Sequence, residues 1–144
     1  AAGLTQILCQ LAKTKPFLGI CLGMQLLFDM GHENSPCPGL GLLPGEVRCM
    51  ETPYKLPQIG WNSLRILRPC ALTEGLSGGE YVYFVHSYAA QAANDTDVCA
   101  VTDYGPPVTA LVARSQLFGC QFHPEKSGDP GLVMLRNFHN ICNG

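Results

Sequence analysis

The stretch PFLGICLGMQLL, residues 16–27, joins a short apolar segment to a helical pattern. Cys21 lies at the junction, with Gly19 and Gly23 two residues to either side. A strand that turns sharply into a helix presents a nucleophile on a strained corner, and glycines remove the Cβ atoms that would collide there. The alternative is a core cysteine beside two packing glycines. Cys21 is therefore a candidate nucleophile whose role depends on what else the chain supplies.

The residue after this cysteine adds to the nucleophile hypothesis. A helix that begins at Leu22 would direct free backbone N–H groups and the positive end of its dipole toward the Cys21 sulfur, which favours the thiolate. The N–H of Leu22 is also well placed to stabilise an oxyanion. We therefore expect both activation of the thiol and oxyanion binding at this corner.

A second motif, CQFHPEKS, occupies residues 120–127. Pro124 favours an extended conformation for the residue before it, so the side chains of His123 and Glu125 can share a face. Glu125 can then orient His123 and stabilise the imidazolium that forms when the ring accepts a thiol proton. By itself the motif fits equally well a turn at a strand end with an incidental histidine. Together with Cys21, it predicts a nucleophile, a base and a residue that orients the base.

Composition excludes several other classes of function. The chain has 144 residues, 47% of them apolar and 14% charged, which fits one globular domain with a buried sheet. The net charge is −2 and there is no basic run, so nothing indicates binding to nucleic acid or to an acidic membrane. The eight cysteines form no C-x-x-C pair and no Cys/His cluster, which predicts free thiols, no metal site and a cytoplasmic protein.

Hydrophobic periodicity predicts alternating helices and strands. Helices are expected over residues 2–13, 22–30 and 130–140, the last with Asp129 as its N-cap. A Pro- and Gly-rich surface loop is expected over residues 32–45, and residues 51–62 are rich in turn formers. Strands are expected over residues 16–20, 46–50, 63–69, 80–88, 97–104, 107–114 and 116–123. This order predicts an α/β fold with an open, mostly parallel sheet flanked by helices, and with ligands at the carboxyl ends of the strands.

The segments KPFLGICLGMQLLF and GCQFHPEKSG are similar to the two signatures of class I glutamine amidotransferases. Within that family, PQIGWNSL, YFVHSY and GLVMLRNF resemble segments of the glutaminase subunit of imidazole glycerol phosphate synthase. The resemblance runs in the same order along nearly the whole chain. It implies a flavodoxin-like amidotransferase domain over residues 1–144 and no metal or organic cofactor.

The resemblance also implies roles for individual residues. Cys21 would attack the side-chain amide of glutamine to give a γ-glutamyl thioester and ammonia. His123, held by Glu125, would protonate the departing ammonia and then activate water. Glutamine would be bound by Leu22, Gln25, His86, Ser87 and Tyr88.

A partner is implied as well, namely the (βα)8-barrel cyclase subunit, which would receive the ammonia and make imidazole glycerol phosphate and AICAR in histidine biosynthesis. Its interface would include Gln58, Gly60, Trp61, Asn62 and Tyr83. Simpler interpretations are that Trp61 fills a core, and that Tyr83 and His86 serve strand packing.

One departure from the family pattern bears on activity. Family members carry a strand and a Gly-rich segment of the P-G-V-G type before the helix that precedes the nucleophile, and nothing similar precedes AAGLTQILCQ. The expectation is a domain without its N-terminal strands and without half of its oxyanion hole. Two alternatives stay open: a glutaminase subunit of another synthase, such as anthranilate synthase, and a catalytically silent fragment that only binds the cyclase.

Overall fold

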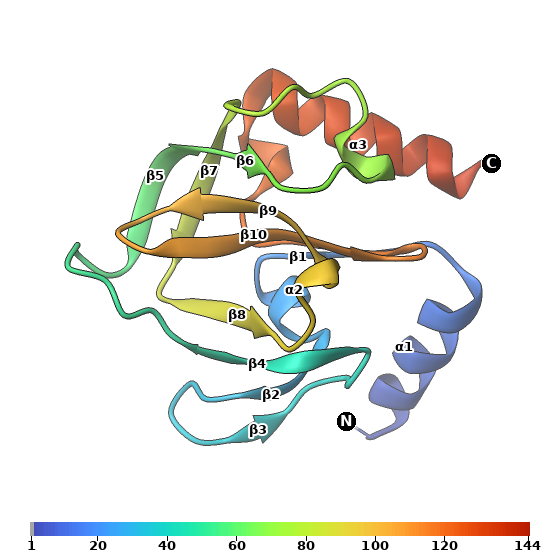
Figure 1. Cartoon of the computed structure of the whole chain (residues 1–144). Coiled ribbons are helices and arrows are strands. Elements are labelled where there is room, and N and C mark those ends of the chain that lie inside the picture. Colours follow the sequence, from blue (N-terminus) through green and yellow to red (C-terminus); the bar gives the residue numbers. More distant parts are fainter. Residues whose placement is uncertain (1) are drawn as a thin grey trace.

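The strand that leads to Cys21, β1 (Phe17–Ile20), lies at one edge of a five-stranded sheet in the computed structural model, which describes residues 2–144 (Figure 1). The strand order in this sheet is β1-β11-β10-β9-β6. β1 runs parallel to β11 (Leu117–Cys120), with Ile20 opposite Cys120. Cys21 therefore follows the last residue of one strand, and the CQFHPEKS motif continues from the neighbouring strand at the same edge.

The other strands form two smaller sheets, one of four strands in the order β3-β2-β4-β8 and one of two strands, β5-β7. The bounds of the strands not yet given are β2 Phe28–Gly31, β3 Cys37–Pro38, β4 Leu43–Cys49, β5 Gln58–Ser63, β6 Arg65–Ile66, β7 Tyr81–His86, β8 Tyr88–Ala92, β9 Val98–Asp103 and β10 Pro107–Arg114. The helices are α1 Ala2–Thr14, α2 Leu22–Gln25 and α3 Gly128–Cys142, with short 3₁₀ turns η1 Ala71–Thr73, η2 Asp95–Asp97 and η3 Pro124–Lys126.

The α/β class is confirmed, with mixed sheets and flanking helices. The mostly parallel sheet is wrong: among the described residues, only the pairs β1–β11 and β2–β4 are parallel, and the other strand pairings are antiparallel. The physical reason is the connections, because β9, β10 and β11 follow one another through short turns that cannot carry a parallel crossover.

Two apolar clusters pack against the five-stranded sheet. Figure 1 shows α3 on one side of this sheet, and α2 with the four-stranded sheet on the other. The first packs α3 against the sheet and is built around Phe84, Phe118, Phe122 and Met134, among others. The second packs α2 and the four-stranded sheet against the other face and includes Met24, Leu27, Phe28 and Leu43. The corner that carries Cys21 is therefore held between two packed layers.

The helix expected over residues 22–30 is wrong, because only Leu22–Gln25 is helical and Phe28–Gly31 is a strand. The carbonyl of Leu26 accepts the N–H of Leu40 at 2.7 Å, and that of Leu27 accepts the N–H groups of Leu42 and Leu43, each at 2.9 Å. These long-range bonds use the carbonyl groups that a longer helix would need.

Three further expectations fail near turns. The loop over residues 32–45 contains β3 and the start of β4, and the turn-rich segment 51–62 contains most of β5. The last helix begins at Gly128, so Asp129 lies in its first turn and Ser127 takes the position before the helix. α1, β1, β7 and β9 to β11 lie where the periodicity predicts them, whereas β8 was not predicted and only residues 65–66 of the strand expected over residues 63–69 form a strand, β6.

Candidate active site

Cys21 occupies a strained corner between β1 and α2. Its φ of 55° and ψ of −109° are unusual for a residue with a side chain. The corner is anchored by the N–H of Cys21, which donates to the carbonyl of Cys120 at 2.7 Å. A Cβ on Gly19 would lie 2.4 Å from the carbonyl oxygen of Gly23, whereas a Cβ on Gly23 would face open space. The predicted nucleophile corner is thus present, and its steric requirement for glycine falls on Gly19.

The sulfur of Cys21 lies in a half-buried setting. Its thiol faces the carbonyl of Val85 at 3.9 Å and receives the side-chain amide of Gln121 at 3.7 Å. Burial raises the pKa of Cys21 and the Glu125 carboxylate raises it too, whereas the N–H of Leu22 and the amide of Gln121 lower it. The expected thiolate is therefore wrong: α2 has only four residues, and its dipole does not outweigh burial.

His123 and Glu125 lie just beyond the carboxyl end of β11. The Nδ1 of His123 is 3.0 Å from Oε2 of Glu125, as the motif predicts. The backbone of His123 is fixed on both sides, since its N–H donates to the carbonyl of Tyr83 at 3.0 Å and its carbonyl accepts the hydroxyl of Ser127 at 2.6 Å. Cys21 and this pair thus share one sheet edge, and among the described residues the Cys21 sulfur contacts Val85, Gln121 and the N–H of Leu22 rather than the imidazole.

A pocket of about 250 Å³ opens beside Cys21. It is lined by the predicted nucleophile Cys21 and by all five residues predicted to bind the substrate, Leu22, Gln25, His86, Ser87 and Tyr88. Three further lining residues were not predicted, namely Glu33, Pro57 and Val85. His123 and Glu125 are outside this lining. The structure therefore brings the predicted nucleophile and the predicted substrate contacts to one cavity.

Comparison with known proteins agrees with these features. The family model "Glutamine amidotransferase class-I" matches residues 1–141. The chain belongs to the class I glutamine amidotransferase family.

Curated relatives in this family carry a more specific name. "Imidazole glycerol phosphate synthase subunit HisH" of Bacillus cereus (strain B4264) is 53% identical over 127 residues, covering 88% of this chain and 60% of the relative. The protein of the same name from Bacillus cytotoxicus is 48% identical over 142 residues, covering 98% of this chain and 68% of the relative. This amidotransferase chain therefore spans about 60–68% of the length of these relatives.

Solved structures agree on the fold. A structure described as a glutamine amidotransferase has a TM-score of 0.71 and 20% identity, with 99% of this chain and 69% of that chain covered. A glutamine amidotransferase from Thermotoga maritima has a TM-score of 0.64 and 16% identity, with 96% of this chain and 62% of that chain covered. At this identity, the likeness supports the fold alone.

Two polar residues near Cys21 were not predicted from the sequence, namely Gln121 and Glu33. Gln121 is fully buried, and its Oε1 accepts Nε2 of Gln25 at 3.0 Å while its own Nε2 reaches Cys21. Glu33, an exposed residue in the stretch expected to be a surface loop, also lines the pocket. The strand alternation of CQFH could have suggested that Gln121 points inward, but nothing local ties Glu33 to the pocket.

Gln25 and His86 act first as structural supports of the pocket. The Nε2 of Gln25 donates to the carbonyl of Tyr88 at 3.0 Å as well as to Gln121. The His86 ring lies between the Tyr88 carbonyl, 2.8 Å from Nδ1, and Oε1 of Gln58, 2.9 Å from Nε2. Burial lowers the pKa of His86, and the hydrogen bond between the ring and the Tyr88 carbonyl opposes this shift.

The residues predicted to face a partner differ in whether their side chains are buried or exposed. Gln58 is 3% exposed and bonded to His86, so its predicted place at an interface is wrong. Trp61 lies in β5 opposite Tyr83 of β7, with ring centroids 5.8 Å apart, and is 55% exposed.

Gly60 and Asn62 are the other two residues of β5 that were predicted to face the partner. Gly60 has a φ of 127°, which favours glycine, and Asn62 donates to the carbonyl of Asp103 at 2.9 Å.

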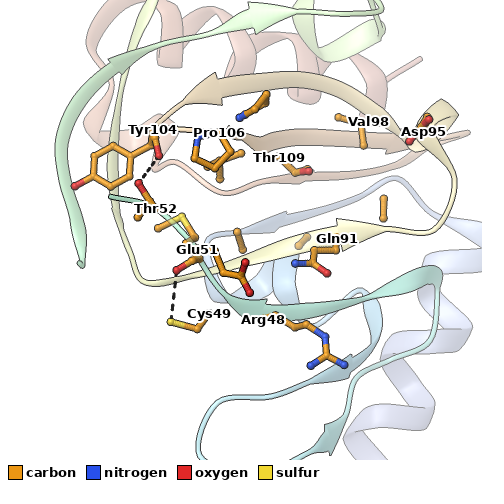
Figure 2. Close-up of a pocket in the computed structure, with 16 residues that line it drawn as sticks. Arg48, Cys49, Glu51, Thr52, Gln91, Asp95, Val98, Tyr104, Pro106 and Thr109 are labelled. Carbon is orange, nitrogen blue, oxygen red and sulfur yellow. Dashed lines mark hydrogen bonds between the residues drawn. The ribbon is translucent and has the colours of Figure 1, made fainter. Parts of the chain in front are cut away.

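A larger pocket of about 450 Å³ lies elsewhere, between the β4–β8 ladder and the β9–β10 hairpin (Figure 2). Arg48, Glu51, Asp95 and Tyr104 are among its lining residues, and Thr52 donates across it to the carbonyl of Tyr104 at 2.6 Å. None of the nine residues around the Cys21 pocket lines it, so pocket size does not identify the site.

The part of the chain that the structure describes also lacks two other features, a cluster of metal ligands and a membrane-spanning helix. Within residues 2–144, no group of three or more His, Cys, Asp or Glu side chains could hold a metal ion. No helix in this part of the chain is long and apolar enough to cross a membrane.

Proposed function

We propose that this amidotransferase hydrolyses glutamine to glutamate and ammonia through a thioester on Cys21, and delivers the ammonia to the cyclase subunit of imidazole glycerol phosphate synthase in the cytoplasm. The observation that carries the proposal is the strained Cys21 corner, which lines a pocket and lies at the same sheet edge as the His123–Glu125 pair. The name of the curated relatives supports the choice of synthase over anthranilate synthase.

The mechanism starts from a protonated thiol. Because burial raises the pKa of Cys21, the thiol needs a base near neutral pH. Glu125 holds Nδ1 of His123 at 3.0 Å, which leaves Nε2 to accept the proton once glutamine is bound. The sulfur then attacks the side-chain carbonyl carbon, and the Leu22 N–H that now points at the sulfur lies next to the oxyanion that forms.

His123 and Cys21 also complete the catalytic cycle, with His123 acting first as an acid and then again as a base. The imidazolium of His123 gives its proton to the departing nitrogen, and ammonia leaves the acyl-thioester. Water then attacks the thioester carbon while His123 accepts its proton, and glutamate is released as the Cys21 thiol reforms.

Two features of the pocket fit the amino-acid end of glutamine. The Glu33 carboxylate pairs with an α-ammonium group by charge and hydrogen bonding. Gln25 is fixed through Nε2, so its carbonyl oxygen can accept a hydrogen bond from a ligand in the pocket.

The partner surface is the outer face of the β5–β7 sheet. Ile59, Trp61 and Tyr81 are each more than half exposed there, and Tyr83 packs edge-on against Trp61. Exposed apolar residues gathered on one face are typical of a protein–protein contact. We infer that this face, defined by Ile59, Trp61, Tyr81 and Tyr83 and called the aromatic face below, docks the cyclase.

The test is glutamate release from glutamine by this chain, in the presence of the ligand-bound cyclase. Turnover that needs the cyclase and disappears in Cys21→Ala supports the proposal. A stable complex without turnover instead supports a catalytically silent binding fragment, and full turnover by Cys21→Ala contradicts the assignment of the nucleophile.

A further inference from the structure

Ser127, the residue before α3, is fully buried and does not use its hydroxyl as a helix cap. A serine in this position commonly accepts an N–H of the first helical turn, but Ser127 makes no such side-chain bond to α3. Its hydroxyl donates instead to the carbonyl of His123 at 2.6 Å and accepts the N–H of Tyr83 at 3.0 Å. The hydroxyl therefore joins the segment that carries the proposed base to β7.

A third hydrogen bond closes this link into a ring, called the Ser127 ring below. The N–H of His123 donates to the carbonyl of Tyr83 at 3.0 Å, so Tyr83 spends both of its backbone groups on residues 123 and 127. Glu125 lies between the ends of this segment, in η3, with Oε2 at 3.0 Å from Nδ1 of His123. The ring thus fixes the base, together with the carboxylate that orients it, against β7.

The same edge of β7 contacts the nucleophile. The carbonyl of Val85 faces the sulfur of Cys21 at 3.9 Å. Alternate residues of a strand direct their carbonyl groups to one edge and lie about 7 Å apart. Tyr83 and Val85 therefore hold the His123 segment and the Cys21 sulfur along a single edge. A shift of residues 123–127 relative to β7 would move the imidazole relative to the thiol.

We propose that Ser127 is a positioning residue for His123, and that its hydroxyl holds the imidazole where it can exchange a proton with the Cys21 thiol. The inference rests on the proposed function, because that function assigns the proton transfer to these two groups. Ser127 is not part of the lining of the Cys21 pocket. Its effect on the reaction therefore passes through His123 and not through the binding of glutamine.

The test measures how fast a diazoketone analogue of glutamine modifies Cys21 in the presence of the cyclase, at several analogue concentrations. These rates separate the maximal rate of modification from the concentration that gives half of it. Ser127→Ala opens the ring and leaves the pocket lining intact, so the maximal rate should fall by about tenfold to a hundredfold at an unchanged half-rate concentration. Ser115→Ala, at an exposed serine between β10 and β11, is the matched control and should react as the wild type does.

A second pair of variants shows whether Ser127 acts through His123. In a chain that already carries His123→Asn, Ser127→Ala should cause no further loss, because the effects of groups that act as a unit are not additive. The same loss in both backgrounds, an unchanged maximal rate, or a change in the half-rate concentration alone would overturn the proposal.

Two further arms keep the outcome decisive. Ser127→Cys replaces the hydroxyl with a weakly hydrogen-bonding thiol of similar size, so it should show the same loss where Ser127→Ala does not fold. Modification of Cys21 without glutamate release from glutamine contradicts the proposed function and leaves the comparison of the variants intact. A wild-type chain that is not modified at Cys21 contradicts both.

Discussion

At the scale of single residues, the site is built from a strained backbone and a buried amide. Cys21 is held at a φ of 55° by its hydrogen bond to Cys120, and the amide of Gln121 reaches the sulfur from a fully buried position. Neither feature is apparent from residue type alone. Both depend on the parallel pairing of β1 with β11, which places residues 21 and 121 side by side.

The first prediction concerns the glycine that the corner requires. In Gly19→Ala the new Cβ would lie 2.4 Å from the Gly23 carbonyl oxygen, so the corner must shift. We expect the variant to lose about 2 kcal/mol of unfolding free energy or more, the usual scale for overpacking. Urea unfolding measures this loss, and Gly23→Ala is the matched control because its Cβ would meet open space. Equal stability of the two variants contradicts the packing account.

The second prediction concerns Gln121. Gln121→Met keeps the length of the side chain and removes the amide that lowers the pKa of Cys21. The pKa of Cys21 should therefore rise further, and alkylation of Cys21 by iodoacetamide should slow at pH 7.5 and recover at higher pH. Gln91→Met, at an exposed position, serves as the control. An unchanged pH–rate profile for Cys21 shows that the Gln121 contact does not act on the thiol.

A third prediction belongs to the pocket and tests the role assigned to Glu33. Glu33→Gln removes the negative charge but preserves the shape of the side chain. If Glu33 pairs with the α-ammonium of glutamine, KM should rise by about tenfold or more with a smaller change in kcat, because lost charge pairing weakens binding by about 1.5–3 kcal/mol. Steady-state glutaminase kinetics with the cyclase present measure this, and an unchanged KM would remove Glu33 from the binding site.

At the scale of helices and strands, pairing between segments far apart in the sequence explains where hydrophobic periodicity predicts the wrong element. Met24 and Leu27 fit a helix of residues 22–30, but both are fully buried where α2 ends and the chain turns toward β2. Trp61 follows turn-forming residues, yet it pairs with Tyr83 across the β5–β7 ladder. Periodicity predicts β7, β9, β10, β11 and the body of α3, though not its start, because those segments bury one consistent face or are buried throughout.

His86 links two elements, and this linkage makes stability depend on pH. The ring joins β7 to Gln58 of β5 and to the Tyr88 carbonyl at the start of β8. Burial lowers the pKa of His86 below its ordinary value of about 6.5, so the unfolded chain binds the proton more readily than the folded one. The contribution of His86 is therefore fully present above about pH 6.5 and is lost as the pH falls toward the folded-state pKa.

The fourth prediction follows from the lowered pKa of His86, which makes the folded state less stable as the pH falls. The free energy of unfolding should fall between pH 7 and pH 5.5, a range that lies above the ordinary titration of carboxyl groups near pH 4. His86→Gln should flatten this slope, while His139→Gln, a change on the exposed side of α3, should preserve it. Urea titrations at several pH values measure the slope. A slope that survives in His86→Gln contradicts the assignment.

At the scale of the whole molecule, the fold places the proposed site and the proposed docking surface in different parts of the chain. The Cys21 pocket lies beside α2, whereas the aromatic face lies on the outer side of the β5–β7 sheet. β7 joins the two, because its outer side carries Tyr81 and Tyr83 while Val85 and His86 at its end line the pocket. Sequence resemblance could predict both regions, but only the folded chain separates exposed Trp61 from buried Gln58.

The fifth prediction tests the aromatic face as the docking surface. Trp61→Ala should weaken binding to the cyclase by roughly thirtyfold or more, which corresponds to about 2 kcal/mol, because exposed tryptophans at the centre of an interface carry much of its binding energy. Isothermal titration calorimetry measures the affinity. Leu132→Ala, at an exposed position on α3, is the control and should bind as the wild type does. Equal affinity of both variants places the partner elsewhere.

The most direct test of the central claim is the site at which a glutamine analogue attaches to the chain. A diazoketone analogue of glutamine, added in the presence of the cyclase, should modify Cys21 and none of the other seven cysteines, as peptide mass spectrometry reports. His123→Asn should slow the modification strongly, since the protonated Cys21 thiol then lacks its base. Modification of another cysteine, or of Cys21 at an unchanged rate in His123→Asn, would contradict the account.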